Sequence, residues 1–486
     1  VRFAQACALE GVTPVFGTDL AVASEGGSSP PRPGRGQAWL EEDHPRVRFL
    51  AATQAGYADL CRTITAAHAT SRSSPHITEE QFGVAAANDG VIALLGADSP
   101  VGRLLAQGRL EAAEHQLRRW LQVFGTERVV LGIRNHKVAP GGRRVAGGSG
   151  FDQTEPGDDV RIRRTLALAE RLGVRAAAVN DVRYLTREDV VVADVMNCVR
   201  QQVPLARQHL GRSTSEAWFT TAADQHARFR ERPDLLLAAH QIATSCEVDL
   251  GIGGLHVPRL SDISAQAAAG ELHRRCWEGV AARYDRVTPR VRERLEQELA
   301  MVDRLGLHDL FLAVAAVVQD IRDMGVLVAC RGSAAGSLVC YALRISDVDP
   351  IANNLAFERF MNPYRDELPD IDLDVESHRR EDVYDLVMAR FGEERTACVA
   401  MLETFQARMA IREVGKALGL SEDITARIAG TVWGSWGRDS LPKERTRQAG
   451  LDPDNPMIAR ACAFATRLLN FPRHLSQHVG GFVLTS

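Results

Sequence analysis

The chain is poor in lysine, with only Lys137, Lys416 and Lys443 among its 58 lysine and arginine residues. Arginine therefore carries nearly all of the positive charge, although a coding bias towards Arg and Ala would produce the same composition. Because the guanidinium group is a planar fork that matches paired oxygens, any phosphate contact is expected to be an arginine contact. The net charge of −4 argues against a protein that is basic all over, yet it leaves room for a local basic groove.

Long hydrophobic runs and paired cysteines are also lacking. The longest apolar run, Leu310 to Val318, is far shorter than the ~20 residues of a membrane helix, and no signal peptide is visible. The nine cysteines form no C-x-x-C pair, which is typical of free thiols in a reducing cytosol rather than of disulfides or a zinc site. We expect a cytoplasmic protein without a membrane span.

At 486 residues the chain should hold about three domains, at roughly 100–200 residues each. In its first 200 residues, short apolar runs alternate with helical stretches such as Leu104 to Phe124, which indicates an α/β domain. The expected strands are Val12 to Phe16, Val91 to Leu95, Val129 to Gly132 and Ala176 to Val179.

The second half of the chain begins with a charged helical pattern, which is followed by predicted strands and shorter helices. Val326 to Ala329 is a predicted strand that leads into a Gly/Ser string, and Ser337 to Leu343 continues as a helix. Ala397 to Met401 is the next predicted strand. Arg408 to Leu418 is a predicted helix, and Gly419 is a plausible cap at its end.

Three aspartates, Asp370, Asp372 and Asp374, follow one another at every second position. In an extended strand they share one face, roughly 6.5–7 Å apart. Like charges at that spacing cost free energy unless cations lie between them. The pattern predicts a metal site, with Asp370 and Asp372 as the first pair; the alternative is a solvent-facing strand with an acidic outer face.

The Gly/Ser string, Arg331 to Ser337, supplies small residues and backbone N–H groups that let a main chain approach a phosphate. It lacks the Walker pattern and the spaced glycines of a dinucleotide fingerprint. By itself it fits a tight turn before a close-packed helix equally well. Together with the aspartates it predicts a metal–triphosphate site, and hence nucleotidyl transfer by two metal ions.

Two further arginines, Arg359 and Arg365, precede the aspartates. A cation at either position would meet the phosphates of a substrate. The alternative is a pair of salt bridges to Glu358, Asp366 or Glu367.

Near the end of the chain, Arg473, His474 and His478 precede Gly480 and Gly481. We expect a basic, flexible segment suited to contacting a nucleic-acid backbone. The alternative is a helix end that is capped by charged side chains.

The first domain contains no H-x-H motif, and its histidines are isolated. Asp19 and Asp181 are expected near strand ends. A phosphoesterase metal site is therefore not expected there.

The motifs of the second half resemble a known family. Residues 331–376, with RGSAAGSLVCYALRISDVDP and FERFMNPYRDELPDIDLDVE, are similar to the alpha subunit of bacterial DNA polymerase III, the C-family DNA polymerases. FPRHLSQHVGGFVL at residues 471–484 resembles the error-prone or accessory branch of that family. VNDVRYLTREDVVVADV at residues 179–195 resembles the end of the family's polymerase-and-histidinol-phosphatase (PHP) domain.

The resemblance implies a multidomain α/β and α+β fold: a truncated PHP-type α/β barrel, then a polymerase-beta-like nucleotidyltransferase palm with an inserted helical thumb. The expected order is a degenerate PHP domain at 1–205, a connecting region at 206–262, palm at 263–400, thumb at 401–478 and the start of a second palm segment at 479–486.

The resemblance also implies a DNA-directed DNA polymerase of replication or repair, with Mg²⁺ as cofactor. Its first two catalytic aspartates fall on Asp370 and Asp372. Its triphosphate contacts fall on Arg331, Gly332, Ser333, Arg359 and Arg365. The implied partners are primer-template DNA, deoxynucleoside triphosphates and, in a full form, a sliding clamp and other replication or translesion proteins.

The chain departs from the family at both ends. The family's third catalytic aspartate lies beyond the Gly-Gly segment, so a fragment with an incomplete metal site is expected. In the first domain, Arg46, Ala97 and Arg183 stand where metal-binding relatives carry His, Cys and His, and Asp19 and Asp181 remain. A non-catalytic DNA-binding fragment or scaffold is the alternative function, and a PHP phosphoesterase is a weaker one.

Overall fold

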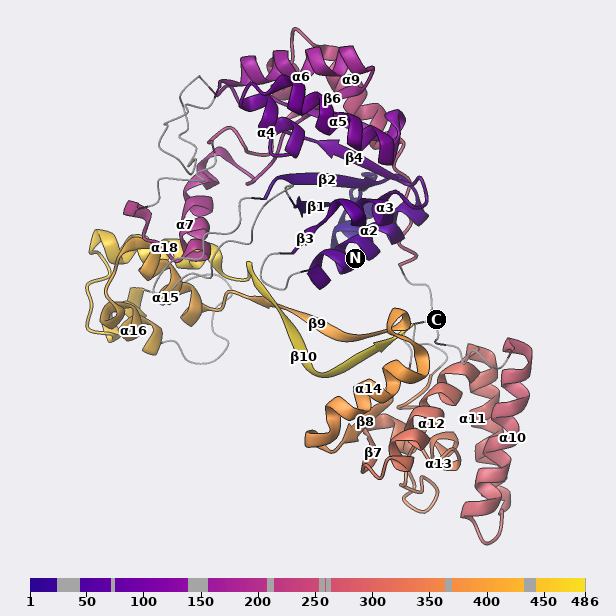
Figure 1. Cartoon of the computed structure of the whole chain (residues 1–486). Coiled ribbons are helices and arrows are strands. Elements are labelled where there is room, and N and C mark those ends of the chain that lie inside the picture. The colour runs from indigo at the N-terminus through magenta and orange to yellow at the C-terminus, as the bar shows by residue number, and fades with distance from the viewer. Residues whose placement is uncertain are drawn as a thin grey trace. The chain divides into compact units, whose positions relative to one another are not determined.

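The computed structural model describes residues 1–23, 44–70, 75–138, 156–207, 214–252, 258, 264–362, 369–431 and 443–485. The chain forms two compact units (Figure 1). The first comprises Val1–Ile252 and Thr404–Pro472, and the second comprises Gly253–Glu403 and Arg473–Ser486.

A six-stranded sheet is the centre of the first unit, in the order β3-β1-β2-β4-β5-β6. The strands are β1 (Gly17–Val22), β2 (Arg46–Ala51), β3 (His76–Ile77), β4 (Val91–Leu95), β5 (Val129–Arg134) and β6 (Arg175–Val179). β2 is antiparallel to β1 and β4, while β4, β5 and β6 are parallel. Within the described residues the sheet is open between β3 and β6, so the closed barrel geometry implied by the resemblance is not seen.

Helices flank this sheet (Figure 1). They are α1 (Arg2–Leu9), α2 (Gln54–Thr70), α3 (Phe82–Ala86), α4 (Pro100–Ala106), α5 (Leu110–Phe124), α6 (Asp158–Leu172), α8 (Ala222–Arg228) and α9 (Pro233–Thr244). α7 (Val190–Gln201) packs instead with the helices of residues 407–468. α5 shows why the flanking helices pack: Ala113, Leu117, Trp120 and Phe124 recur at helical spacing and are all fully buried. Each large apolar side chain buried in this way contributes roughly 1.5–3 kcal/mol.

The later part of the first unit is helical and has its own core. It contains α15 (Ala407–Leu418), α16 (Glu422–Gly430), α17 (Lys443–Gln448) and α18 (Pro456–Leu468). α15 places Ala410, Ile411, Val414 and Ala417 on one buried stripe, which packs in one cluster with apolar residues of α7. An ion pair between Arg467 and Asp189 joins the same two parts of the chain.

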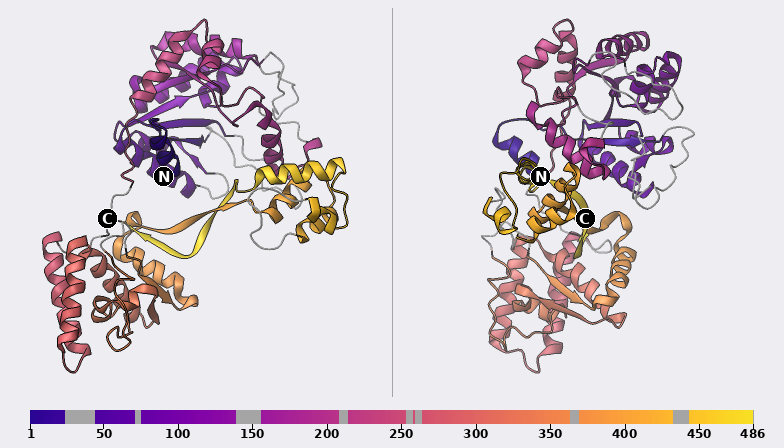
Figure 2. Two further views of the ribbon diagram at one scale, coloured as in Figure 1. Left: turned by 180° about the vertical axis from the view of Figure 1, so that it is seen from behind. Right: turned by 90° about the vertical axis from the view of Figure 1, so that its left-hand side faces the viewer.

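The second unit contains three long helices, one short strand pair and one longer strand pair. Its elements are α10 (Ala265–Arg283), α11 (Pro289–Leu305), α12 (His308–Asp323), β7 (Val328–Arg331), η5 (Gly332–Gly336), α13 (Leu338–Ala342), β8 (Asp372–Val375), α14 (Arg380–Phe391), β9 (Thr396–Thr404) and β10 (Pro472–Leu484). β7 pairs with β8, and the longer β9 pairs with β10 (Figure 2). α13 is buried along its whole length between α10 and α11, which fixes the turn in front of it.

Among the described residues, no helix combines the length and the apolar character that a membrane crossing requires.

Candidate active site

The two sequence strings that suggested a metal–triphosphate site meet in one antiparallel strand pair. β7 and β8 are in register with Arg331 opposite Asp372 and Ala329 opposite Asp374. Because side chains alternate across a strand, Cys330 and Leu373 turn towards the apolar core of the second unit. The opposite face carries the charged residues, so chain segments about forty residues apart in sequence place their charges side by side.

Arg331 is shared between two carboxylates on that face. Its Nε lies 3.0 Å from Asp374 Oδ1, and its Nη2 lies 3.9 Å from Asp372 Oδ2. The side chains of Arg331 and Asp374 are each 62% exposed and that of Asp372 is 43% exposed. Ion pairs at this exposure are worth about 0–1 kcal/mol, so Arg331 does not prevent the carboxylates from binding another cation. Asp370 is also exposed, directly before β8.

Gly332 brings the main chain close to the Asp372 carboxylate. Its φ of +71° lies in the left-handed region that favours glycine. A Cβ atom at Gly332 would lie 3.5 Å from Asp372 Oδ2, in van der Waals contact with it. At the other end of the turn, a Cβ at Gly336 would come within 2.8 Å of the Ala356 carbonyl oxygen. Positive φ thus favours glycine at 332, and the nearby Ala356 carbonyl favours it at 336, with Ser333 half-buried between them.

A buried carboxylate on α11 holds the start of α13. Glu298 is fully buried, and its Oε2 accepts hydrogen bonds from Ser337 Oγ at 2.9 Å and Val339 N at 3.1 Å. Its Oε1 accepts from Arg294 Nε at 2.6 Å. Burial raises the pKa of the Glu298 carboxyl, and Arg294 and the backbone N–H groups of Leu338 and Val339 oppose that rise.

Arg294 extends this network to a second segment. Its Nη2 donates to the carbonyl oxygens of Gly336 at 3.0 Å and Leu355 at 3.1 Å. Its guanidinium carbon lies 5.6 Å from the ring centroid of Phe357. Sequence reasoning missed both Arg294 and Glu298, because they lie in a charged helix and their partners are distant along the chain.

Arg359 lies on an exposed turn between the buried rings of Phe357 and Phe360. Among the described residues it forms no ion pair, so the expected alternative of a salt bridge to Glu358 is absent there. Arg365 lies outside the described residues.

Arg473, His474 and His478 lie in β10. The expectation of a flexible segment is wrong, as is the alternative of a capped helix end, because these residues are extended and pair with β9. His474 and His478 are exposed and Arg473 is half-buried. The His478 Nδ1 atom accepts a hydrogen bond from Gly481 N at 2.6 Å.

In the first unit, arginines surround the two retained carboxylates. Arg46 Nε lies 2.7 Å from Asp19 Oδ1, and Arg48 Nε lies 3.4 Å from Asp19 Oδ2. Arg48 also pairs with Asp181, and Arg134 Nη1 lies 3.4 Å from Asp181 Oδ2. Burial alone would raise the pKa of the Asp181 carboxyl, but Arg48 and Arg134 outweigh it and hold that pKa below its usual range. Guanidinium groups thus neutralise both carboxylates.

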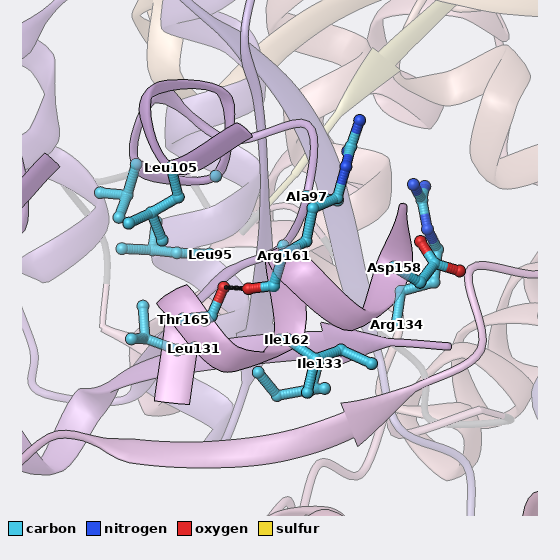
Figure 3. Close-up of a pocket in the computed structure, with 14 residues that line it drawn as sticks. Leu95, Ala97, Leu105, Leu131, Ile133, Arg134, Asp158, Arg161, Ile162 and Thr165 are labelled. Atoms are coloured by element: carbon cyan, nitrogen blue, oxygen red, sulfur yellow. Dashed lines mark hydrogen bonds between the residues drawn. The ribbon is translucent and has the colours of Figure 1, made fainter. Parts of the chain in front are cut away.

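A small cavity lies between the C-terminal ends of β4 and β5 and the helices α4 and α6 (Figure 3). Its lining is mainly apolar, with Arg134, Asp158 and Arg161 at one side, and it includes Ala97 but neither Asp19 nor Asp181. Its volume of about 20 Å³ has room for a water molecule rather than a nucleotide. In the described part of the chain, no three His, Cys, Asp or Glu side chains are arranged to hold a metal ion.

Comparison with protein families matches two segments of the chain, which do not coincide with the two compact units. Residues 1–136 match the PHP domain, and residues 270–486 match the bacterial DNA polymerase III alpha NTPase domain. The chain therefore contains segments of both the PHP domain and the bacterial DNA polymerase III alpha NTPase domain, as its motifs predicted.

Its relatives include proteins named error-prone DNA polymerase. That of Rhodopseudomonas palustris (strain BisB5) is 41% identical over 334 residues, 68% of this chain and 30% of the relative. That of Brucella abortus (strain 9-941) is 40% identical over 331 residues, which are 68% of this chain and 31% of the relative. That of Caulobacter vibrioides (strain ATCC 19089) is 39% identical over 327 residues, which are 67% of this chain and 30% of the relative. The chain spans about 30% of the length of these relatives.

Proposed function

We propose that the β7–β8 face and the Gly332–Gly336 turn form the nucleotide-binding part of the active site of a DNA-directed DNA polymerase. The observation that carries this proposal is the approach of the turn to Asp372. A glycine with positive φ, which lies in van der Waals reach of a half-exposed carboxylate, creates room for a metal-bound triphosphate beside the main chain.

Asp370 and Asp372 would hold Mg²⁺. Both are accessible oxygen donors, and Mg²⁺ is usually bound by one or two carboxylates together with substrate phosphates rather than by an all-protein cage. When bound, the ions would activate the primer 3′-hydroxyl and stabilise the leaving pyrophosphate.

The chain's own groups would position the substrate. Gly332 and Ser333 present the turn to the triphosphate, and the exposed Arg359 is free to contact its oxygens. Arg331 and Arg365 are proposed to add positive charge for binding the triphosphate. Such fixed donors lower the barrier by orienting the substrate and stabilising the charge that develops.

The proposed partners are primer-template DNA and deoxynucleoside triphosphates. Arg473, His474 and His478 on β10 would contact the DNA backbone, since basic and polar side chains supply most phosphate contacts. We further propose the palm and thumb division at residues 263–400 and 401–478, the clamp partner, and a cytoplasmic location.

A second candidate is a non-catalytic DNA-binding module. The observation that favours it is that Asp372 and Asp374 already share Arg331, and no third acidic ligand joins them within the described residues. A PHP phosphoesterase is disfavoured, because arginines occupy the carboxylates that such a site would use.

Calorimetric titration of the chain with dATP and Mg²⁺, followed by incubation with a primer-template, separates these functions. A polymerase site binds dATP only when Mg²⁺ is present, with or without primer extension. A DNA-binding module retains the primer-template but shows no Mg²⁺-dependent dATP binding, and that result would contradict the proposal.

A further inference from the structure

The Gly332–Gly336 turn and the segment that leads to Arg359 are held by the same side chain. Arg294 donates to the Gly336 carbonyl at the end of the turn and to the Leu355 carbonyl four residues before Arg359. Both acceptors are main-chain atoms, so the bonds fix the path of the backbone rather than the packing of a side chain. A displacement of Arg294 would therefore move both segments.

Glu298 in turn fixes Arg294. The two residues are one turn apart on α11, and the 2.6 Å bond from Nε to Oε1 leaves Nη2 of the guanidinium group directed at the two carbonyls. The other carboxylate oxygen binds Ser337 Oγ and Val339 N, directly after the turn. The pair thus binds the backbone on both sides of Ser337. Arg294 donates to the carbonyl of Gly336, and Glu298 accepts from the N–H group of Val339.

We propose that Arg294 and Glu298 are positioning residues for triphosphate binding, which set the Gly332–Gly336 turn and the Arg359 segment in one fixed arrangement. This role deepens the proposed polymerase function and rests on it. Neither residue touches the nucleotide in this account, because Glu298 is fully buried beneath the turn. Their effect is on the geometry in which Gly332, Ser333 and Arg359 meet the phosphates.

The arrangement goes beyond ordinary core packing. A buried carboxylate is costly unless it is paired, and apolar residues fill the rest of this core. Its hydrogen bonds are directed at main-chain groups of the two segments that the proposed site uses. Because a misplacement of about 1 Å can cost about a hundredfold in rate, such directed bonds matter for the geometry of the site as well as for stability.

The test compares Glu298→Gln with Arg290→Gln. The amide of Gln removes the charge that orients Arg294 while it keeps the size of the side chain. Arg290 is a matched control, because it lies on the same helix and donates at 2.8 Å to Asn354 Oδ1, next to Leu355, but is exposed. Hydrogen–deuterium exchange of the full chain measures the backbone, and dATP titration with Mg²⁺ measures binding.

In Glu298→Gln we expect amide exchange to accelerate about tenfold or more at residues 332–340 and 355–361, and dATP affinity to fall by about tenfold. Arg290→Gln should leave both quantities within about twofold of the unmodified chain. Arg294→Lys keeps the positive charge but loses the guanidinium fork, so it should loosen the same two segments, and it replaces Glu298→Gln if that variant does not fold.

Unchanged exchange in both segments, or faster exchange spread evenly over the second unit, would overturn the inference. So would faster local exchange with unaltered dATP affinity. If the unmodified chain binds no dATP, the proposed function fails, while the exchange data still show whether the pair positions the turn.

Discussion

Each unit contains a group of carboxylates beside arginine, and the two groups differ in burial. Asp181 in the first unit has a side chain only 4% exposed and contacts both Arg48 and Arg134. Asp372 in the second unit is 43% exposed and has only a 3.9 Å contact with Arg331. A buried, fully paired carboxylate serves the fold, whereas an exposed, weakly paired one is available to a ligand.

The largest effect is expected from breaking the buried group. Asp181→Asn leaves Arg134 without its carboxylate partner and Arg48 with Asp19 alone, and removing one partner of a buried ion pair costs about 3–5 kcal/mol. Asn also tolerates the φ of 50° at this position, so the loss of stability reports the removal of the negative charge and not backbone strain. Denaturant unfolding should show this decrease for Asp181→Asn and a change within about 0.5 kcal/mol for Asp372→Asn. Equal losses in the two variants would remove the distinction between the groups.

Next in size is the pH dependence of the first unit. The folded pKa of Asp181 is below its usual range, so its contribution to stability is fully present above the unfolded value of about 3.9. That contribution is lost as the pH falls through the folded pKa. The difference in the free energy of unfolding between the unmodified chain and Asp181→Asn should therefore be constant at neutral pH and shrink in acid. A difference that grows below about pH 4 would contradict the assignment.

The smallest effect is expected from the exposed pair. Arg331→Gln removes the contacts with Asp372 and Asp374, and pairs at this exposure contribute about 0–1 kcal/mol. The midpoint temperature of thermal unfolding should change by only about a degree or two, and by less at 0.5 M salt, where such ion pairs are screened. A large loss of stability would show that Arg331 serves the fold as Arg48 does.

The sequence predicted the elements whose signals are local. Val91 to Leu95 is a strand at the expected residues because all five side chains are apolar and buried. The helix expected at Arg408 to Leu418 is observed at Ala407–Leu418, and Gly419 caps it with φ of +78°. Such patterns lie within one segment of the chain, so they can be recognised without knowing which other segments pack against it.

Other strands were missed or shifted. β2 alternates buried Val47 and Phe49 with Arg46 and Arg48, so a search for apolar runs passes over it. The prediction of a strand at Val12 to Phe16 is wrong, since the strand starts at Gly17. Here the pairing with β2 decides where the strand lies, and pairing is not visible in a single segment.

The candidate site was predicted in part for the same reason. Asp372 and Gly332 stand out because aspartates at alternate positions and a Gly/Ser string are informative by type and spacing. Arg294 and Glu298 do not stand out, because charged residues one turn apart are common on solvated helices. Their function depends on partners such as Ser337, 39 residues away from Glu298.

The most direct test of the central claim, that Asp370 and Asp372 are the carboxylates of the nucleotide site, is calorimetric titration of dATP with Mg²⁺ into Asp372→Ala and Asp374→Asn. Both residues lie on the same face and both approach Arg331, so each controls for the other. The account predicts that Asp372→Ala loses dATP affinity by at least about tenfold, as expected when a charged metal contact is removed, while Asp374→Asn stays within about threefold. Unchanged affinity in Asp372→Ala, or an equal loss in both variants, would contradict it.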